Sequence, residues 1–370
     1  MNGWPAPGLP PEILTAGYEH LLRPLLFRSH GGDPEAIHET MIALLARLGR
    51  TPAPGLIRLI TGAPRSAVTV AGIRFPGRIG LAAGLDKDGL AAPLWGALGF
   101  GFAELGTVTP RPQPGNPAPR LFRLRRSRAI LNRMGFNNDG AACLAERLNG
   151  FGARRGEGLA GIPLGVSIGK NKTTLEEEAV EDYLAALTMV APYADYLAIN
   201  VSSPNTPGLR RLQDAGRLRG LLSSVTRETR RLNPEAPIPV FVKVAPDLDE
   251  EGFDDVVAAV EQSGAAGLIA TNTTVSRAGL RGNDGRLASE AGGLSGAPLT
   301  ARARAVVAAL RTRTRLPIIA SGGVMTPSDA VALIDAGADL VEICTGFIYS
   351  GPGLVTGADR RLASHRSERI

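Results

Sequence analysis

The sequence has few of the residues that build disulfide frameworks and metal sites. Its 370 residues include two cysteines, Cys143 and Cys344, and four histidines. The cysteines lie far apart and form no CxxC motif or Cys/His cluster, so neither a disulfide framework nor a zinc site is indicated. We therefore expect a protein of a reducing compartment that binds no metal ion.

Long apolar runs are missing as well. No window approaches the roughly 20 apolar residues that a membrane-spanning helix requires. The N-terminus also lacks the charged region and the uninterrupted apolar stretch of a secretion signal. These absences argue against secretion and against a membrane-spanning protein.

Several common catalytic motifs are absent too. The sequence contains no HExxH, GxSxG or Walker motif and no paired catalytic carboxylates. What it has is an ordinary globular composition, with 44% hydrophobic and 21% charged residues and a net charge of +6. The positive charge favours anionic partners, but it does not choose between nucleic acid, an anionic membrane surface and acidic small molecules.

From about residue 77 the chain repeats one pattern: a short apolar run, a polar or glycine-rich stop, and a helical segment. Short continuous apolar runs are typical of parallel strands buried on both faces, and helices supply the crossovers between such strands. The eight runs are Ile79 to Ala83, Phe102 to Leu105, Pro163 to Ile168, Tyr196 to Ile199, Val240 to Val244, Gly267 to Ala270, Pro317 to Ala320 and Leu340 to Ile343. Helices are expected at Leu90 to Leu98, Leu175 to Val190, Arg217 to Leu232, Glu250 to Ser263, Ala301 to Arg313 and Pro327 to Ala336.

Eight such units predict an α/β fold, a (β/α)8 TIM barrel. A doubly wound open sheet is the main rival, but no GxGxxG motif follows the first run. The stretch 107–160 is too long for one connection, so we expect an insertion at the barrel rim that includes a hairpin formed by LFRL and RAILN.

A small two-helix hairpin domain is expected before the barrel. The first helix spans residues 15–27 with a kink at Pro24, and Asp33-Pro34 begins the second. Their apolar stripes are Tyr18, Leu21, Leu22, Leu25 and Leu26, and then Ile37, Met41, Leu44, Leu45 and Leu48. We divide the chain into the hairpin (1–50), a connector (51–76) and the barrel (77–370). From the pattern alone, the hairpin is either a lid on the barrel or a surface that rests on a membrane.

Polar residues follow every expected strand at once. The stops read AAGLDKDG, GTVTP, GKN, NVSSPNT, KVAPD, TNTT, SGGV and CTG. Since the carboxyl ends of barrel strands share one face, these residues converge on one pocket. The SGG turn is either a phosphate cradle or a simple glycine turn. Lysines and amides without metal ligands favour a phosphate-bearing organic cofactor such as a flavin.

The longest of these motifs resemble those of class 2 dihydroorotate dehydrogenases, which are quinone-dependent and membrane-associated. The resemblance covers the chain from about residue 12 and rests on AAGLDKDG, GTVTP, PQPGNPAPRLFR, NRMGFNN, IGKN, NVSSPNTPGLR, KVAPD, TNTT, GGLSG and SGGV. It implies one FMN per chain and oxidation of (S)-dihydroorotate to orotate in the synthesis of UMP.

Site residues are carried over from the matching motifs. The resemblance implies that FMN contacts Ala82, Ala83, Gly84, Thr107, Asn171, Asn200, Lys243, Thr271, Gly296, Gly323, Cys344 and Thr345. It implies that the substrate contacts Lys87, Asn132, Arg133, Met134, Gly135, Phe136, Asn200, Asn205, Asn272 and Thr273. Cys344 is a departure, because well-known relatives carry a tyrosine there.

The same resemblance implies the catalytic roles. Ser203 matches the base that removes the C5 proton, while the C6 hydride goes to N5 of FMN. A serine is a weak base, so Thr206 is expected to pass the proton onward and Phe136 to belong to the catalytic set. Lys87 would hold the substrate carboxylate and Lys243 the pyrimidine end of the flavin. Ser202, one position away, should point elsewhere.

Two markers imply the class. Soluble class 1 relatives use a cysteine where Ser203 stands, and they lack the N-terminal hairpin. The resemblance therefore implies that the hairpin forms a quinone tunnel, with His38 and Arg123 near FMN, and rests on lipid. It also implies a monomer, peripheral at the cytoplasmic face of the cell membrane.

Two alternatives remain. A tRNA dihydrouridine synthase is another FMN barrel, and the basic charge would suit it. It requires a catalytic cysteine and an RNA-binding tail, whereas the chain ends soon after the last expected strand, at ASHRSERI, so we expect no nucleic acid partner. A non-catalytic membrane-binding barrel would leave the lysines, amides and Ser203 unexplained.

Overall fold

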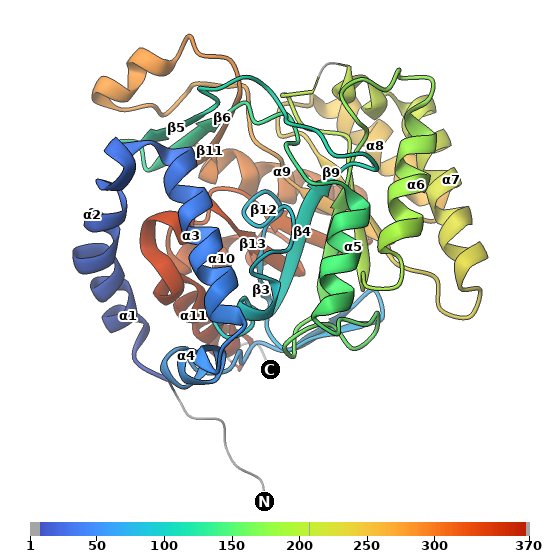
Figure 1. Cartoon of the computed structure of the whole chain (residues 1–370). Coiled ribbons are helices and arrows are strands. Elements are labelled where there is room, and N and C mark those ends of the chain that lie inside the picture. Colours follow the sequence, from blue (N-terminus) through green and yellow to red (C-terminus); the bar gives the residue numbers. More distant parts are fainter. Residues whose placement is uncertain (1–7, 207, 368–370) are drawn as a thin grey trace, which may run out of the picture.

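The computed structural model describes residues 8–206 and 208–367, and it contains a closed barrel of eight parallel strands (Figure 1). The strands are, in chain order, β3 (Ile79–Leu81), β4 (Phe102–Val108), β7 (Leu164–Ile168), β8 (Tyr196–Asn200), β9 (Val240–Val244), β10 (Gly267–Ala270), β12 (Ile318–Ser321) and β13 (Leu340–Ile343). Each strand pairs with its neighbour in chain order, and β13 pairs with β3 to close the ring. The predicted TIM barrel and all eight predicted strands are therefore confirmed.

Helices cover the outside of the barrel. They are α5 (Ala141–Gly150), α6 (Ala179–Val190), α7 (Ala215–Leu232), α8 (Glu250–Ser263), α9 (Thr300–Arg313), α10 (Pro327–Asp335) and α11 (Thr345–Ser367). Thr326 caps α10 in a reciprocal capping box, and Gly264 ends α8 in a left-handed conformation.

One predicted helix is wrong. The segment Leu90 to Leu98 forms only a short 3-10 turn, η3 (Ala92–Leu94), between β3 and β4. Asp86 explains this, because its carboxylate accepts hydrogen bonds from the backbone N–H groups of Leu90 and Ala91 and from Nε1 of Trp95. These bonds satisfy the backbone N–H groups without a helix. Pro93 also lacks the N–H group that would donate a helical hydrogen bond.

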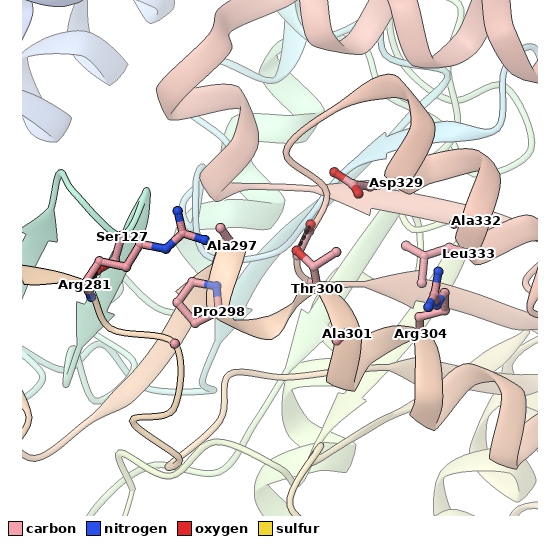
Figure 2. A pocket seen from close by; sticks show the side chains of 13 residues that line it. Ser127, Arg281, Ala297, Pro298, Thr300, Ala301, Arg304, Asp329, Ala332 and Leu333 are labelled. Carbon is pink, nitrogen blue, oxygen red and sulfur yellow. Dashed lines mark hydrogen bonds between the residues drawn. The ribbon is translucent and has the colours of Figure 1, made fainter.

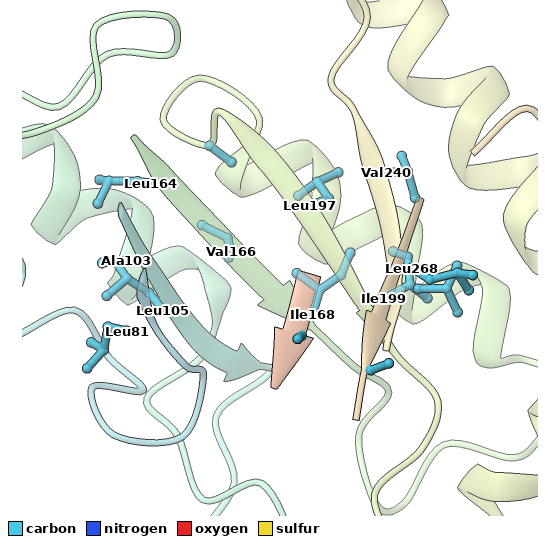
Figure 3. Close-up of a cluster of buried hydrophobic side chains, with 14 of the residues drawn as sticks. Leu81, Ala103, Leu105, Leu164, Val166, Ile168, Leu197, Ile199, Val240 and Leu268 are labelled. Atoms are coloured by element: carbon cyan, nitrogen blue, oxygen red, sulfur yellow. The ribbon is translucent and has the colours of Figure 1, made fainter. Parts of the chain in front are cut away.

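Successive side chains along each strand point alternately into the barrel and toward the surrounding helices. Val240, Val242 and Val244 of β9 pack in the large cluster beneath the helices, whereas Phe241 packs inside the barrel. Figure 3 shows part of the outer cluster, with Leu164 and Val166 of β7 beside Leu197 and Ile199 of β8. The interior layer at the lower end of the barrel is apolar and consists of Phe102, Tyr196, Phe241, Ile269, Ile319 and Leu340, with Val70 and Phe75 below them.

Residues 51–76 close the lower end of the barrel. They contain helix α4 (Ala53–Thr61) and the antiparallel pair β1 (Val68–Val70) and β2 (Ile73–Phe75). Phe75 is fully buried and packs edge-to-face against Phe102, so the pair acts as a plug under the interior layer. The opposite, carboxyl end of the barrel is thereby left as the open end.

The N-terminal helices lie on one flank of the barrel (Figure 1). They are α1 (Pro11–Gly17), the π-helical turn η1 (Tyr18–Leu22), α2 (Arg23–Leu26) and α3 (Pro34–Gly49). The distortion precedes the expected kink at Pro24: the N–H of Arg23 bonds to the carbonyl of Tyr18 in a widened turn. Pro24 cannot donate to the ladder, so the bond shifts to its neighbour. Asp33 caps α3 as predicted, and its side chain accepts from Glu35 and Ala36.

The first apolar stripe is split in the structure. Tyr18, Leu22 and Leu26 face the barrel and line a cavity, whereas Leu21 and Leu25 are 71% and 69% exposed. The predicted stripe therefore divides into one row that lines the cavity and one row that is exposed.

The insertion 107–160 forms the predicted hairpin. Strands β5 (Leu121–Leu124) and β6 (Ala129–Asn132) pair antiparallel, and β11 (Gly293–Gly296) adds to β6 from a distant part of the chain. This three-stranded sheet stands beside the ends of α2 and α3 above the open end of the barrel (Figure 1).

Within residues 8–206 and 208–367, no helix is long and apolar enough to cross a membrane. The outermost residues of the expected hairpin and barrel units, 1–7 and 368–370, lie outside the described part of the chain.

Candidate active site

A cavity of about 430 Å³ opens at the carboxyl ends of the barrel strands and continues between the barrel and the segment from η1 to α3. It brings together most of the predicted site residues. Those that line it are Ala82, Ala83, Gly84, Lys87, Thr107, Asn132, Met134, Gly135, Phe136, Asn200, Ser203, Asn205, Lys243, Thr271, Asn272, Thr273, Gly296, Gly323, Cys344 and Thr345, with His38 and Arg123.

Three predicted site residues do not line the cavity. The Asn171 amide donates to Thr109, to the carbonyl of Arg111 and to Gln113, so it holds the neighbouring loop. Arg133 turns outward to Glu290, with Nη1 and Oε2 2.6 Å apart. The Thr206 hydroxyl is buried, and its Oγ1 has no hydrogen-bond partner among the described residues.

The two serines after β8 point in different directions. Ser203 lines the cavity, and its Oγ accepts from the backbone N–H of Asn205 at 3.3 Å. Ser202 is fully buried and does not line the cavity; its Oγ accepts from Nδ2 of Asn272 at 3.0 Å. Alternation along an extended segment produces this difference, as the sequence predicted.

A chain of amides fixes the wall around Ser203. Asn200 donates to Thr107 at 2.8 Å, and its Oδ1 accepts from Asn272 at 3.2 Å. On the opposite side, Nδ2 of Asn205 donates to Oδ1 of Asn132 at 3.2 Å. The remaining acceptor, Oδ1 of Asn205, is buried and has no partner among the described residues. A buried orphan acceptor beside a cavity indicates a place for a ligand N–H group.

Lys87 stands at the cavity wall after β3. It makes no hydrogen bond or ion pair to another residue within the described ranges, although Asp88 and Glu35 act on it electrostatically. Burial lowers the pKa of its ammonium group, whereas Asp88 and Glu35 raise it. A partly buried ammonium group without a bonded partner favours an anionic ligand.

Lys243 lies deeper, at the end of β9, in a cluster that we did not predict. Its Nζ is 3.0 Å from Oε1 of Glu104 on β4 and 3.3 Å from Oε2 of Glu342 on β13. Burial lowers the pKa of Lys243, but the two carboxylates outweigh it and the pKa lies above its usual value. The sequence held a signal for this cluster: each charge stands two positions after an inward-facing apolar residue of its strand.

The glycine turn after β12 separates this cavity from a second one of about 340 Å³. At Gly323 (φ +74°) a Cβ atom would lie 2.3 Å from Cα of Thr300, so only glycine lets the turn lie against the start of α9. Figure 2 shows Thr300 in the wall of the smaller cavity, where its Oγ1 donates a hydrogen bond to the carbonyl of Gly323 at 2.6 Å. This bond holds the turn toward the larger cavity, next to the N-terminus of α10.

The far end of the larger cavity, which we call the apolar end, is lined mainly by the N-terminal helices. Its residues are Tyr18, Leu22, Leu26, Phe27, Ile37, His38, Met41, Ile42, Leu45 and Arg123. The Arg123 guanidinium stacks over the Phe27 ring at 4.0 Å, and its Nη1 has no hydrogen-bond partner among the described residues. Burial, together with the charge of Lys87, lowers the pKa of His38 to about 3, so its imidazole is neutral at physiological pH.

Cys344 lines the cavity. Burial raises the pKa of its thiol to about 11, and Lys243 and Lys87 lower it by less. The thiol is therefore protonated at neutral pH and is neither a nucleophile nor a metal ligand in this state. Across the described residues, no group of three or more His, Cys, Asp or Glu side chains is placed to hold a metal ion.

Comparisons with known proteins show the family. The family model described as dihydroorotate dehydrogenase matches residues 65–365. The quinone-type dihydroorotate dehydrogenase of Chloroflexus aurantiacus is 51% identical over 357 residues, which cover 94% of this chain and 96% of that protein. The corresponding protein of Salinispora arenicola is 52% identical over 352 residues, or 92% and 97% of the two chains.

Solved structures agree as well. The ligand-free dihydroorotate dehydrogenase of Eimeria tenella superposes with a TM-score of 0.81 and 38% identity, over 91% of this chain and 96% of that one. Its complex with ferulenol gives 0.80 and 36%, over 94% and 95%. The chain therefore belongs to the dihydroorotate dehydrogenase family and, within it, to the quinone-dependent enzymes.

Proposed function

We propose that the cavity carries out both halves of the reaction, with dihydroorotate at its polar end and the quinone at its apolar end. As a quinone-dependent dihydroorotate dehydrogenase, the protein oxidises dihydroorotate in pyrimidine biosynthesis with FMN as cofactor. The polar end consists of Lys87, Asn132, Asn200, Ser203, Asn205, Lys243 and Asn272. The observation that carries the proposal is Lys87, an unbonded ammonium group that faces the same cavity as Ser203.

The residues present fit FMN. The backbone at Gly323 and the start of α11 at Thr345, which both line the cavity, would offer N–H groups to a phosphate. A Cβ atom on Gly84 would meet no protein atom within 4 Å, so the space beside it is open to a ring. Thr107, Asn200 and Lys243 would hold the polar edge of that ring. When bound, FMN accepts the substrate hydride and passes the electrons to the quinone.

The polar end would orient dihydroorotate through opposite charges and paired amides. Lys87 would bind the substrate carboxylate by a charge-assisted hydrogen bond. The unpartnered Oδ1 of Asn205 would accept from a ring N–H group, while Asn132 and Asn272 hold the other edge. The carboxamide chain is formed by bonds between protein groups, so the site is arranged in advance of binding.

Ser203 would act as the base that takes the C5 proton. It lines the cavity between these amides, and its Oγ keeps a lone pair beyond the bond from Asn205. Thr206 does not reach the cavity, but its unpartnered buried hydroxyl lies three residues along the same loop. We propose that Thr206 receives the proton from Ser203 and that Phe136 excludes water from the reacting face.

The apolar end would admit the quinone. Leucines, Met41 and Phe27 provide the apolar wall, and the free Nη1 of Arg123 would donate to a quinone oxygen. The neutral imidazole of His38 would face the same ring without adding charge to an apolar wall.

The outer face of the same helices would rest on lipid. Leu21 and Leu25 are 71% and 69% exposed, on helical segments whose inner face lines the apolar end, and Ile13 of the preceding helix α1 is 58% exposed. Exposed leucines on one flank are typical of a peripheral membrane helix. We propose peripheral attachment at the cytoplasmic face, which places the cavity entrance at the quinone pool. One chain lines the whole cavity, in agreement with a monomer.

The test is anaerobic reduction of the purified protein. It should be yellow with bound FMN, bleach when dihydroorotate is added and regain colour when a quinone is added. Retention of the flavin absorbance in the presence of dihydroorotate would overturn the proposal, and bleaching by a dihydrouridine-containing tRNA would support the alternative flavin barrel.

A further inference from the structure

Three charged side chains form a buried cluster under the polar end of the cavity. Glu104, Lys243 and Glu342 come from three different strands, and their relative exposures are 0%, 5% and 1%. One ammonium group is bonded to two carboxylates, at 3.0 Å and 3.3 Å. With all three groups ionised, the barrel interior would carry an uncompensated negative charge.

Burying an uncompensated charge is costly, so the cluster lowers its free energy by taking up a proton. Lys243 is not the group that changes state, because the two carboxylates hold its pKa above the usual value and it is already protonated. The additional proton therefore belongs to one of the two glutamates.

The hydrogen bonds distinguish the glutamates. Both oxygens of Glu104 have partners, since Oε1 faces Lys243 and Oε2 accepts from the Tyr196 hydroxyl at 3.4 Å. Oε2 of Glu342 faces Lys243, but Oε1 is buried and has no hydrogen-bond partner among the described residues. Glu342 also lines the cavity, whereas Glu104 does not.

The surroundings favour the proton on Glu342. Burial raises the pKa of Glu342 well above its usual value, the charge of Glu104 raises it further, and Lys243 opposes both. The other titratable groups that act on Glu342 are Tyr196 from β8 and Cys344 from its own strand, and burial raises the pKa of each, so both are neutral.

We infer that Glu342 is a neutral carboxylic acid beside Lys243 and that it responds to the charge of the cofactor. In this state Glu104 alone balances Lys243. A hydride transferred into the cavity adds one negative charge, which a neutral Glu342 tolerates and an ionised Glu342 repels. This inference rests on the proposed placement of FMN next to Lys243.

The balance of charge and protons follows. At low pH the hydride enters, Glu342 keeps its proton and no further proton moves. At a pH where Glu342 has ionised, entry of the hydride is accompanied by uptake of one proton from solvent onto the Glu342 carboxylate. No other bond forms or breaks at this residue.

The test compares the two-electron midpoint potential of bound FMN in the wild type and in Glu342→Gln across a pH series. The amide keeps the shape of the neutral acid, so the two curves should coincide at low pH. Above the ionisation of Glu342 the wild-type equilibrium constant should fall an additional tenfold per pH unit, about 30 mV for a two-electron couple. Curves that stay parallel at every pH would overturn the proton exchange.

Infrared difference spectra between the wild-type holoenzyme and its variants test which residue carries the proton. The wild type should show a protonated carboxyl band that Glu342→Gln lacks. Glu104→Gln should lose the same band, because Glu342 would then ionise beside Lys243. Survival of the band in Glu342→Gln would overturn the assignment.

A further variant separates this inference from the proposed function. Lys243→Met should weaken FMN binding or shift its potential if FMN lies at this end of the cavity. No change in either would mean that the placement of FMN is wrong. A change in Lys243→Met without any in Glu342→Gln would refute the Glu342 inference alone.

Discussion

The two ends of the cavity are built in opposite ways. At the polar end the side chains are bonded to one another before any ligand arrives, as in the chain from Asn272 through Asn200 to Thr107. At the apolar end the wall consists of leucines and aromatic rings on short helices, and Arg123 is held mainly by stacking over Phe27. On the proposed placement of the two partners, the difference teaches how one chain can serve both: a rigid amide frame would select a small polar substrate, and an adaptable apolar wall would admit a larger apolar one.

The largest expected effect is at the polar end. Ser203→Ala should keep FMN bound and slow its reduction by dihydroorotate about 10² to 10⁴-fold, the contribution of a positioned base. Ser202→Ala is the matched control, since its hydroxyl lies one position away and faces Asn272. Stopped-flow bleaching measures both variants, and equal rates for the two would refute the role of Ser203.

Lys87→Met would remove the proposed carboxylate partner. Loss of a charge-assisted bond of about 1.5–3 kcal/mol should weaken orotate binding by about 10- to 100-fold. Equilibrium titration of the flavin spectrum measures this change. Lys172→Met is the control, because Lys172 is exposed and bonds to Asn116. Unchanged affinity in Lys87→Met would place the carboxylate elsewhere.

Arg123→Met tests the other end. It should slow reoxidation by quinone by about 10-fold or more and leave reduction by dihydroorotate unchanged, because a hydrogen bond to a charged group is lost only at the apolar end. Arg125→Met is the matched control: Arg125 lies in the turn directly after the same strand and donates to the Phe27 carbonyl, but it does not line the cavity. Slower flavin reduction by dihydroorotate in Arg123→Met would show that the apolar end also affects the reaction at the polar end.

The outer face of the hairpin should give a smaller effect. The double variant Leu21→Gln/Leu25→Gln should bind anionic vesicles several-fold more weakly, since full burial of one leucine contributes about 1.5–3 kcal/mol and a surface helix buries only part of it. Leu175→Gln is the control, with a leucine 62% exposed outside the hairpin. Vesicle co-sedimentation measures this, and equal losses in both would argue against a lipid-facing hairpin.

The smallest expected effect is on the pH dependence of stability. The pKa of His38 is about 3 in the folded protein against 6.5 in the unfolded chain, so only the unfolded chain takes up this proton between those values. The contribution is present above pH 6.5 and is lost as the pH falls toward 3. His38→Gln should reduce this acid destabilisation in a denaturant titration, and an unchanged pH profile would show that His38 is solvated.

Much of the fold could be predicted because the signals were local. Each strand run ends in a polar stop, and Thr326 and Gly264 carry their capping chemistry in the sequence itself. The failed helix at Leu90 to Leu98 shows the limit. Its apolar residues suited a helix, but the Asp86 carboxylate satisfied the backbone N–H groups of a loop instead. The division of the stripe around Leu21 into a lining row and an exposed row likewise could not be predicted from periodicity.

For the site, the sequence predicted which strand ends converge, but it did not predict which of their side chains line the cavity and which bond to other segments. It predicted the different directions of Ser202 and Ser203 from alternation. It could not place Arg133 on Glu290 or Asn171 on the Arg111 loop, because both partners come from distant segments. It also missed Glu104 and Glu342, which look like isolated charges in separate strands.

By itself the sequence determined the barrel, its open end and the chemistry gathered there, because strand periodicity and stop residues are local properties of the chain. Only the tertiary structure decided the charge state of the interior. Glu104, Lys243 and Glu342 come from three separate strands, and only closure of the barrel brings the two carboxylates to one ammonium group. Electrostatic energy depends on distance in space and on burial, and neither is a property of one segment.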